Sequence, residues 1–276
     1  MKNFNFKNVS QALVSTLLLL AGSSSFAATP ASWNLSTGCG NGASSLVCSG
    51  DAYGVVINGY STTGGSSTFA NATIYNYGGN TNGSDAGGLG IVASGESSGA
   101  TGPHAMDNIG ATDAMMLSFA GFSVSLSSLT VGWNGSANSD APTGYKDSDV
   151  SIYAWMGSGT PTDAVELLTN GTTPNAAIGT GGLINAGWVL VGNNIQNVGL
   201  QTDNTVSFNT GVNPVSSSYW LVTPGPTTNN GTVGDSFKLV SVGGTQTRVP
   251  EPGSLALIGA GLLGFIASRR RKQGSN

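Results

Sequence analysis

The amino-acid sequence predicts an all-β protein, and three observations carry that prediction. Glycine accounts for 43 of the 276 residues, often in pairs that are typical of tight turns. Charged residues make up only 8%, so stretches rich in the strong helix formers Lys and Glu are scarce. Between the turns lie short apolar or alternating runs of strand length. We expect a single, jelly-roll-like β-sandwich of roughly ten to twelve strands over residues 28–248.

The expected strands follow one another with turn-rich sequence between them. They are residues 53–60, 68–77, 89–93, 114–119, 122–133, 150–156, 188–192, 201–209, 219–223 and 237–242. In the run 122–133 the apolar parity switches at Ser127-Ser128, which predicts a bulge or a bend. Residues 161–169 have the sequence of a short helix, and residues 243–249 read as a brief linker. No repeat of fixed period is evident, which argues against a solenoid or propeller.

Residues 1–27 have the three parts of a secretory signal peptide. These parts are the basic residues Lys2 and Lys7, an apolar core over 12–21 and the small-x-small sequence Ser25-Phe26-Ala27. We expect export through the secretory translocon and cleavage between Ala27 and Ala28. A membrane anchor is the alternative, but an apolar core of about ten residues is too short to cross ~30 Å of hydrocarbon.

The exported body, residues 28–248, is acidic. It holds twelve of the thirteen acidic residues but only three basic ones, Lys146, Lys238 and Arg248, which gives a net charge of −9. Nucleic-acid binding needs a basic face that neutralises phosphates, so DNA and RNA are not expected as partners. The composition fits an extracellular module.

The two cysteines, Cys39 and Cys48, are separated by eight residues near the start of the mature chain. In an oxidising compartment such a pair predicts a disulfide. A metal site is the alternative, but no second pair of ligands lies nearby in the sequence.

Catalytic chemistry has few candidate residues in the body. His104 is the one histidine, and no Gly-x-Ser-x-Gly elbow accompanies the many serines. A glycosidase needs two facing carboxyl groups, and Glu96 and Glu166 are the only glutamates before the tail. A packing role is the simpler interpretation of His104, and a secreted hydrolase stays a weak alternative.

Two acidic clusters suggest calcium instead. One contains Asp107, Asn108 and Asp113, and the other contains Asp140 and Asp147-Ser148-Asp149. Ca²⁺ takes six to eight oxygen ligands, and Asp- and Asn-rich loops at the rim of a β-sandwich supply such groups. We expect Asp107, Asp147 and Asp149 as ligands if calcium binds. Asx-turns and solvated loop charges are the alternative.

Aromatic residues raise the possibility of carbohydrate binding, because sugar rings stack on flat apolar faces. The body contains five tryptophans, mostly inside strand patterns where a core position is expected. Tyr145, in the polar loop 134–149, is the best candidate for a rim contact.

The tail, residues 249–276, holds three features in a fixed order. They are the triplet Pro250-Glu251-Pro252, an apolar run over 255–267 and the basic cluster Arg269-Arg270-Arg271-Lys272. Proline fixes φ and has no amide donor, so the triplet stays extended and accessible to an enzyme. The apolar run suits a transmembrane helix, and the basic cluster would hold its end on the cytoplasmic side.

This order resembles the PEP-CTERM sorting signal of Gram-negative bacteria. The resemblance implies recognition and cleavage at Pro250-Glu251-Pro252 by an exosortase, a membrane cysteine protease, with the basic cluster stopping transfer. It also implies an association with exopolysaccharide and biofilm or floc formation. At ~1.5 Å per residue the apolar run spans about 20–24 Å, less than the hydrocarbon core, which indicates a temporary hold at the inner membrane before transfer to the cell surface or matrix.

The body resembles the exosortase-dependent surface proteins over the segments from Asp107 to Trp155 and in the later sequences WVLVG and DSFKLVSVGG. That resemblance implies a β-sandwich surface protein and supplies no catalytic residues. The leading hypothesis is a non-enzymatic surface or matrix protein. A carbohydrate- or calcium-dependent adhesion module is the alternative.

Overall fold

The structure is a computed structural model that describes most of the body. The described residues are 28–50, 53–62, 69–78, 87–95, 104–108, 111–134, 148–159, 161, 187–195, 204–225, 235–248, 259 and 261–262. Within them nearly all regular structure is β-strand, in two antiparallel sheets, which confirms the all-β prediction. The short helix α2 (Leu35–Gly38) is an exception, capped by the Asn34 side chain, which accepts a hydrogen bond from Thr37 N.

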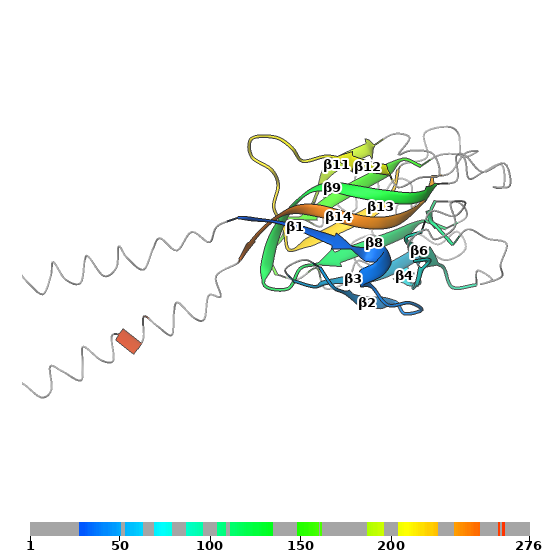
Figure 1. Ribbon diagram of the computed structural model, residues 1–276, viewed down its shortest axis with the longest axis horizontal. Coiled ribbons are helices and arrows are strands. Elements are labelled where there is room, and N and C mark those ends of the chain that lie inside the picture. The colour runs from blue at the N-terminus through cyan, green and yellow to red at the C-terminus, as the bar shows by residue number, and fades with distance from the viewer. Residues whose placement is uncertain are drawn as a thin grey trace, which may run out of the picture.

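The first sheet is organised around one long strand, β14, that runs through its middle (Figure 1). The order β12-β9-β14-β6-β5 gives the main path, and β1 and β7 also pair with β14. The strands are β1 (Thr29–Asn34), β5 (Thr73–Asn76), β6 (Leu89–Val92), β7 (Met106–Asp107), β9 (Phe122–Asn134), β12 (Asn204–Ser207) and β14 (Ser236–Arg248).

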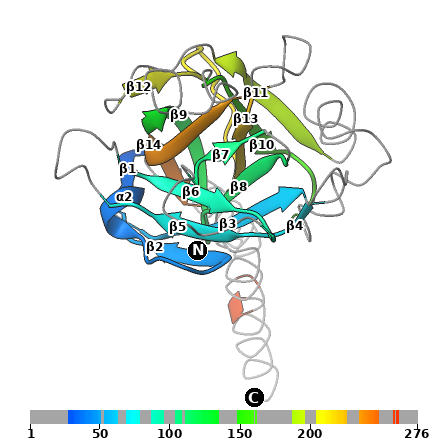
Figure 2. The same ribbon diagram turned by 90° about the vertical axis from the view of Figure 1, so that its right-hand side faces the viewer.

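The second sheet has the order β11-β10-β13-β8-β3-β2, with β4 also pairing with β3. Its strands are β2 (Ser45–Cys48), β3 (Val55–Thr62), β4 (Phe69–Asn71), β8 (Asp113–Ser118), β10 (Val150–Trp155), β11 (Trp188–Ile195) and β13 (Tyr219–Pro224). Figure 2 shows β9 and β14 on the left and β13, β10 and β11 on the right.

One hydrophobic core takes side chains from both sheets. Trp33, Val124 and Leu239 enter it from the first sheet, and Ile57 and Leu117 enter it from the second. Burying such side chains removes apolar surface from water, which is the main stabilising contribution to the fold. A second buried cluster collects the opposite parity of the second sheet: Tyr60, Phe69, Ala114, Met116, Tyr153, Trp188 and Leu221.

The predicted irregularity at Ser127-Ser128 is a register shift between β9 and β14. Ser128 pairs with Gly243 and Leu126 pairs with Gly244, so Ser127 is the extra residue. The backbones approach closely here, since a Cβ on Gly244 would lie 2.3 Å from the Ser125 carbonyl oxygen. The shift lets both parities of β9 face the core, as the sequence pattern requires.

Two predictions about strand boundaries are wrong. The run 68–77 is not one strand, because the chain passes at Ala72 from β4 in the second sheet to β5 in the first. Gly59 permits this crossing, since a Cβ there would lie 3.0 Å from the Ala72 carbonyl oxygen. Residues 243–248 are not a linker either, because they continue β14 and pair with β9 up to Arg248.

Several predicted features lie outside the described residues. They are the signal peptide with Ala27, the helix 161–169 apart from Pro161, the residues Glu96, Glu166, Asp140, Tyr145 and Asp147, the triplet Pro250-Glu251-Pro252 and the cluster Arg269-Arg270-Arg271-Lys272. Within the part of the chain that is described, no helix is long and apolar enough to cross a membrane.

Candidate functional site

A buried polar network lies at the end of the body where β8, β10 and β14 begin and β7 ends. Asp235 is its centre: Oδ1 accepts from Asp149 N at 2.9 Å and Oδ2 accepts from Asn108 Nδ2 at 2.9 Å. A second hydrogen bond joins the same two residues, in which Asn108 Oδ1 accepts from Asp235 N at 2.8 Å. Beside it, the Asp113 carboxylate accepts from Asp107 N at 3.0 Å. Carboxylates that accept backbone N–H groups in this way hold separate chain segments together.

The network bears on the calcium prediction. It brings Asp107 and Asp149 to the same end of the body, and both are buried, while Asp147 lies outside the described residues. Among the residues that the structure describes, no three acidic, histidine or cysteine side chains converge as a metal site requires. Calcium binding therefore stays a prediction, and the bonds shown by Asp113 and Asp235 are those of structural acceptors.

An aromatic patch lies at the same end of the body, on the first sheet. We define it as Tyr75, Tyr77 and His104. Their ring centroids are separated by 5.8 Å (Tyr75–His104), 6.2 Å (Tyr77–His104) and 6.5 Å (Tyr75–Tyr77), with interplanar angles of 25°, 18° and 33°. In a face-to-face column the outer rings would be about twice as far apart as neighbours. The three nearly equal distances place the ring centroids at the corners of a triangle, and the interplanar angles are no larger than 33°, so the rings form one aromatic cluster.

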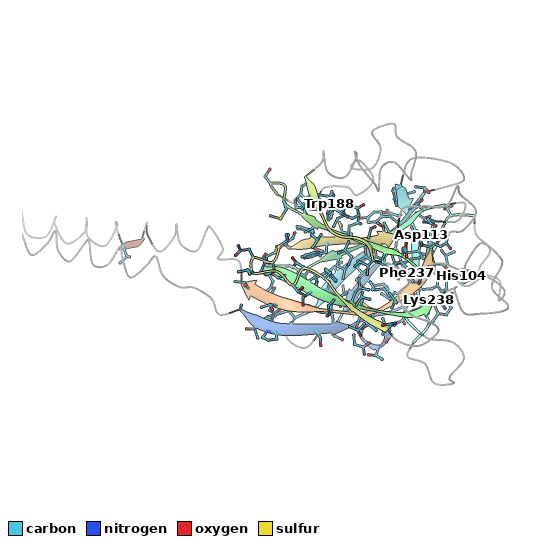
Figure 3. The ribbon with its side chains drawn as sticks, turned by 90° about the horizontal axis from the view of Figure 1, so that it is seen from above. His104, Asp113, Trp188, Phe237 and Lys238 are labelled. Atoms are coloured by element: carbon cyan, nitrogen blue, oxygen red, sulfur yellow. A yellow bond between two sulfur atoms is a disulfide. The ribbon has the colours of Figure 1, made fainter. Side chains whose placement is uncertain are left out.

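Lys238 fixes this patch from beneath. Its ammonium nitrogen lies 3.7 Å from the centroid of the Tyr77 ring, a cation–π contact, and the lysine itself is buried. Tyr77 keeps 41% of its surface exposed. Burial of the rest, with the neighbouring Tyr75, raises the pKa of Tyr77 to about 12. Figure 3 shows His104 and Lys238 together at this end of the molecule, with Asp113 nearby.

The two cysteines form a disulfide that links the end of α2 to the end of β2. The Cys39 carbonyl also accepts a bond from Asn76 Nδ2 at 3.0 Å, which ties this loop to β5. The disulfide thus joins the residue that follows α2 to β2, at the edge of the second sheet.

The tail is attached at the opposite end of the body, where β14 ends. Thr29, the second residue after the expected signal cleavage, pairs with Gln246, and Arg248, the last residue of β14, pairs with Phe122. The start of β1 and the end of β14 therefore leave the body side by side (Figure 1). We call this end, where residues 29, 122 and 248 lie, the tail-proximal end.

Comparison with known proteins identifies the segment that begins here. The family model of the PEP-CTERM protein-sorting motif matches residues 248–272. The tail is a PEP-CTERM sorting motif. It marks an exported protein with a C-terminal sorting signal and implies processing by an exosortase. No curated protein and no solved structure shows significant similarity to the chain.

The PEP-CTERM motif starts at Arg248, the last residue of the central strand β14. The sequence did not predict this direct connection, because residues 243–249 were expected to form a linker. It also missed Asp235 as the centre of the network and the pairing of His104 with Tyr75 and Tyr77. The two tyrosines did carry a signal, because residues two apart on a strand share one face. Nothing in the sequence links Asn108 to Asp235, which are 127 residues apart.

Proposed function

We propose that this protein is an exported, non-enzymatic surface or matrix protein, held briefly at the inner membrane by its tail and released by an exosortase. The observation that carries the proposal is the sorting motif at residues 248–272. The acidic body supports an extracellular role, and its two sheets support a single jelly-roll-like sandwich as the delivered product. In this scheme the tail crosses the inner membrane with the basic cluster in the cytoplasm.

A non-enzymatic role is supported by the structural contacts of the residues that most often act as nucleophile or base. Both cysteines are joined in a disulfide, and His104 packs against Tyr75 and Tyr77. A general base needs a partner within hydrogen-bond reach of the group it activates. The ring contacts of His104 indicate a packing role instead.

The sorting role is tested by replacing Pro250 and Pro252 with alanine and following the protein by cell fractionation. We expect the variant to accumulate uncleaved in the inner-membrane fraction. Pro214→Ala is the matched control, because Pro214 is an exposed loop proline outside the motif. Release of the double variant at the rate of the control would show that the triplet plays no part in sorting.

A second candidate function is carbohydrate binding, favoured by the aromatic patch. Sugar rings stack on the apolar faces of aromatic side chains, and the exposed Tyr77 ring of this cluster offers such a face. The Lys238 contact holds Tyr77 in place before any ligand arrives. The net charge of −9 disfavours anionic polymers, so a neutral exopolysaccharide is the class that fits best.

Affinity electrophoresis in gels containing a neutral glucan or a polyuronate, with calcium or with chelator, would test this function. We expect retardation by the glucan under both conditions and its loss in Tyr75→Ala/Tyr77→Ala. Tyr53→Ala is the control, because Tyr53 is a similarly exposed tyrosine beside Phe122 at the tail-proximal end. Retardation that needs calcium would instead favour the acidic loops, and equal loss in the control would refute a role for the patch.

A further inference from the structure

The tail-proximal end lies within a few ångströms of the sorting motif. Arg248 is still hydrogen-bonded in β14, and only Val249 separates it from Pro250. Two residue steps reach at most about 7 Å. Whatever surface holds the tail must therefore face this end of the folded body.

Exposed apolar side chains gather at this end. Six large hydrophobic side chains are exposed among the described residues of the body: Val47, Tyr53, Tyr77, Met156, Val189 and Val212. Tyr77 belongs to the aromatic patch at the opposite end. The other five belong to the tail-proximal half, as the strand pairings show.

The pairings place these side chains step by step. Val47 pairs with Val56, which pairs with Ser118 at the end of β8, three residues before Gly121 turns the chain into β9. Tyr53 packs on Phe122, the first residue of β9, at a ring distance of 4.0 Å. Val47 and Tyr53 therefore both lie toward the start of β9, where Phe122 pairs with Arg248.

Met156 and Val189 lie at the same end of the second sheet. Met156 N donates to Gly187 O at 2.8 Å, and Val189 pairs with Ala154 on the neighbouring strand. The carbonyl of Trp155 accepts from Ser217 Oγ at 2.7 Å, and Ser217 pairs with Val124, two residues into β9.

Val212 stands on a well-fixed loop between β12 and β13. Asn209, with φ at 53°, organises the loop: its Nδ2 donates to Leu126 O at 2.9 Å and to Val215 O at 2.8 Å, and its Oδ1 accepts from Val215 N at 2.8 Å. Asparagine tolerates this left-handed conformation better than most residues. The loop holds Val212 98% exposed, an apolar side chain fixed in solvent.

Among the described residues, acidic and basic side chains are distributed in the opposite sense to the exposed apolar ones. The structure describes four acidic residues, and all belong to the network at the far end: Asp113 and Asp235 through their carboxylates, and Asp107 and Asp149 through their backbone N–H groups. Arg248 is the described basic side chain at the tail-proximal end, whereas Lys238 lies beneath Tyr77. An anionic lipid surface repels acidic groups and attracts basic ones, so it would favour this orientation.

We propose that the tail-proximal end docks on the phospholipid headgroup surface while the tail is in place, inserting Val212, Val47, Met156 and Tyr53 shallowly into the interface. This inference rests on the proposed function, because the tail must hold the chain at the membrane. Apolar side chains from separate segments, with a tyrosine among them, suit the interfacial region better than a continuous protein interface. The docked body would present the Pro250 region at the membrane surface and turn the aromatic patch outward.

The test uses the full chain from Ala28 in vesicles of phosphatidylethanolamine and phosphatidylglycerol, with nitroxide groups near the top of the acyl chains. A cysteine introduced by Val212→Cys or, as the far-end control, Tyr77→Cys carries an environment-sensitive fluorophore, because both native cysteines are in the disulfide. We expect blue-shifted emission and at least about twofold stronger quenching for the label at 212.

A tether alone would also bring position 212 near the membrane, so a second variant separates the two effects. Adding Val47→Ser and Met156→Ser to Val212→Cys removes apolar contacts and leaves the tail unchanged. Docking predicts that blue shift and quenching then fall toward the values at position 77. Equal quenching at both labels, or no effect of the serine changes, would refute docking and leave sorting untouched. Release of the chain by alkaline extraction would refute membrane anchoring and docking together.

Discussion

The polar network around Asp235 supports a quantitative stability prediction, because both oxygens of its carboxylate have defined hydrogen-bond donors. The Asp235 carboxylate accepts two hydrogen bonds, from Asp149 N and from Asn108 Nδ2, both at 2.9 Å. Asp235→Asn keeps the shape of the side chain but replaces one acceptor oxygen with a donor. One of the two donors, Asp149 N or Asn108 Nδ2, then faces the new amide N–H group instead of an acceptor, in a buried site.

The magnitude follows from these contacts. Removing one partner of a buried hydrogen bond to a charged group costs about 1.5–3 kcal/mol, because the remaining donor is left without an acceptor. We therefore expect Asp235→Asn to lower the free energy of unfolding by about 2–3 kcal/mol. Asn108→Asp should cost at least as much, because it sets two carboxylates against each other.

The exchanged double variant, Asn108→Asp with Asp235→Asn, restores one donor–acceptor pair with the polarity reversed. We expect it to be more stable than the sum of the single losses predicts, by about 1 kcal/mol or more. Asn213→Asp makes the same chemical change at an exposed loop position and should lie within about 0.5 kcal/mol of the parent.

Urea unfolding followed by tryptophan fluorescence measures these differences, since Trp33, Trp188 and Trp220 are buried in the fold. Strict additivity in the double variant would refute the direct bond between the two side chains. So would a loss for Asp235→Asn no larger than that of Asn213→Asp. A stability gain on adding calcium, lost in Asp235→Asn, would show that the network doubles as a metal site.

Three further predictions concern the disulfide, the bulge and a tyrosine. Replacing Cys39 and Cys48 with serine should cost about 2–3 kcal/mol in urea unfolding, and an unchanged midpoint would contradict this. Gly244→Ala forces a Cβ into the opposite backbone and should cost at least about 2 kcal/mol, whereas Gly211→Ala, which meets nothing within 4 Å, should be nearly neutral. Because the folded-state pKa of Tyr77 is about 12 against an ordinary 10, its contribution to stability is complete below pH 10 and declines as pH rises to 12. Tyr77→Phe should lose less stability over that window than the parent in parallel urea titrations, and an identical loss would argue against the raised pKa.

Local sequence patterns determined the strand content of this protein. Alternation and turn residues placed β8, β9, β10 and β13 close to their observed bounds, because side chains two apart share a face and glycine pairs end strands. The parity switch at Ser127-Ser128 even located the bulge. The tail could be identified because a sorting motif acts as a short, linear signal read from its own residues.

Long-range pairing was decided only by the tertiary structure. Residues 243–248 look like a glycine-rich linker, yet they form the centre of a sheet because β9 bulges to meet the two glycines. The run 69–76 alternates like one strand but is divided between two sheets at Ala72. Such outcomes depend on partners that are distant in sequence, whose presence no local window reports.

The two ends of the body show the same division. The sequence by itself specified what the tail is, because each of its parts acts through composition and order. It could not show that the tail leaves beside the start of β1, among exposed apolar side chains, or that Asp235, Asn108 and Asp149 meet at the far end. Those arrangements arise from antiparallel pairing, which brings residues more than a hundred positions apart to one end of a sheet.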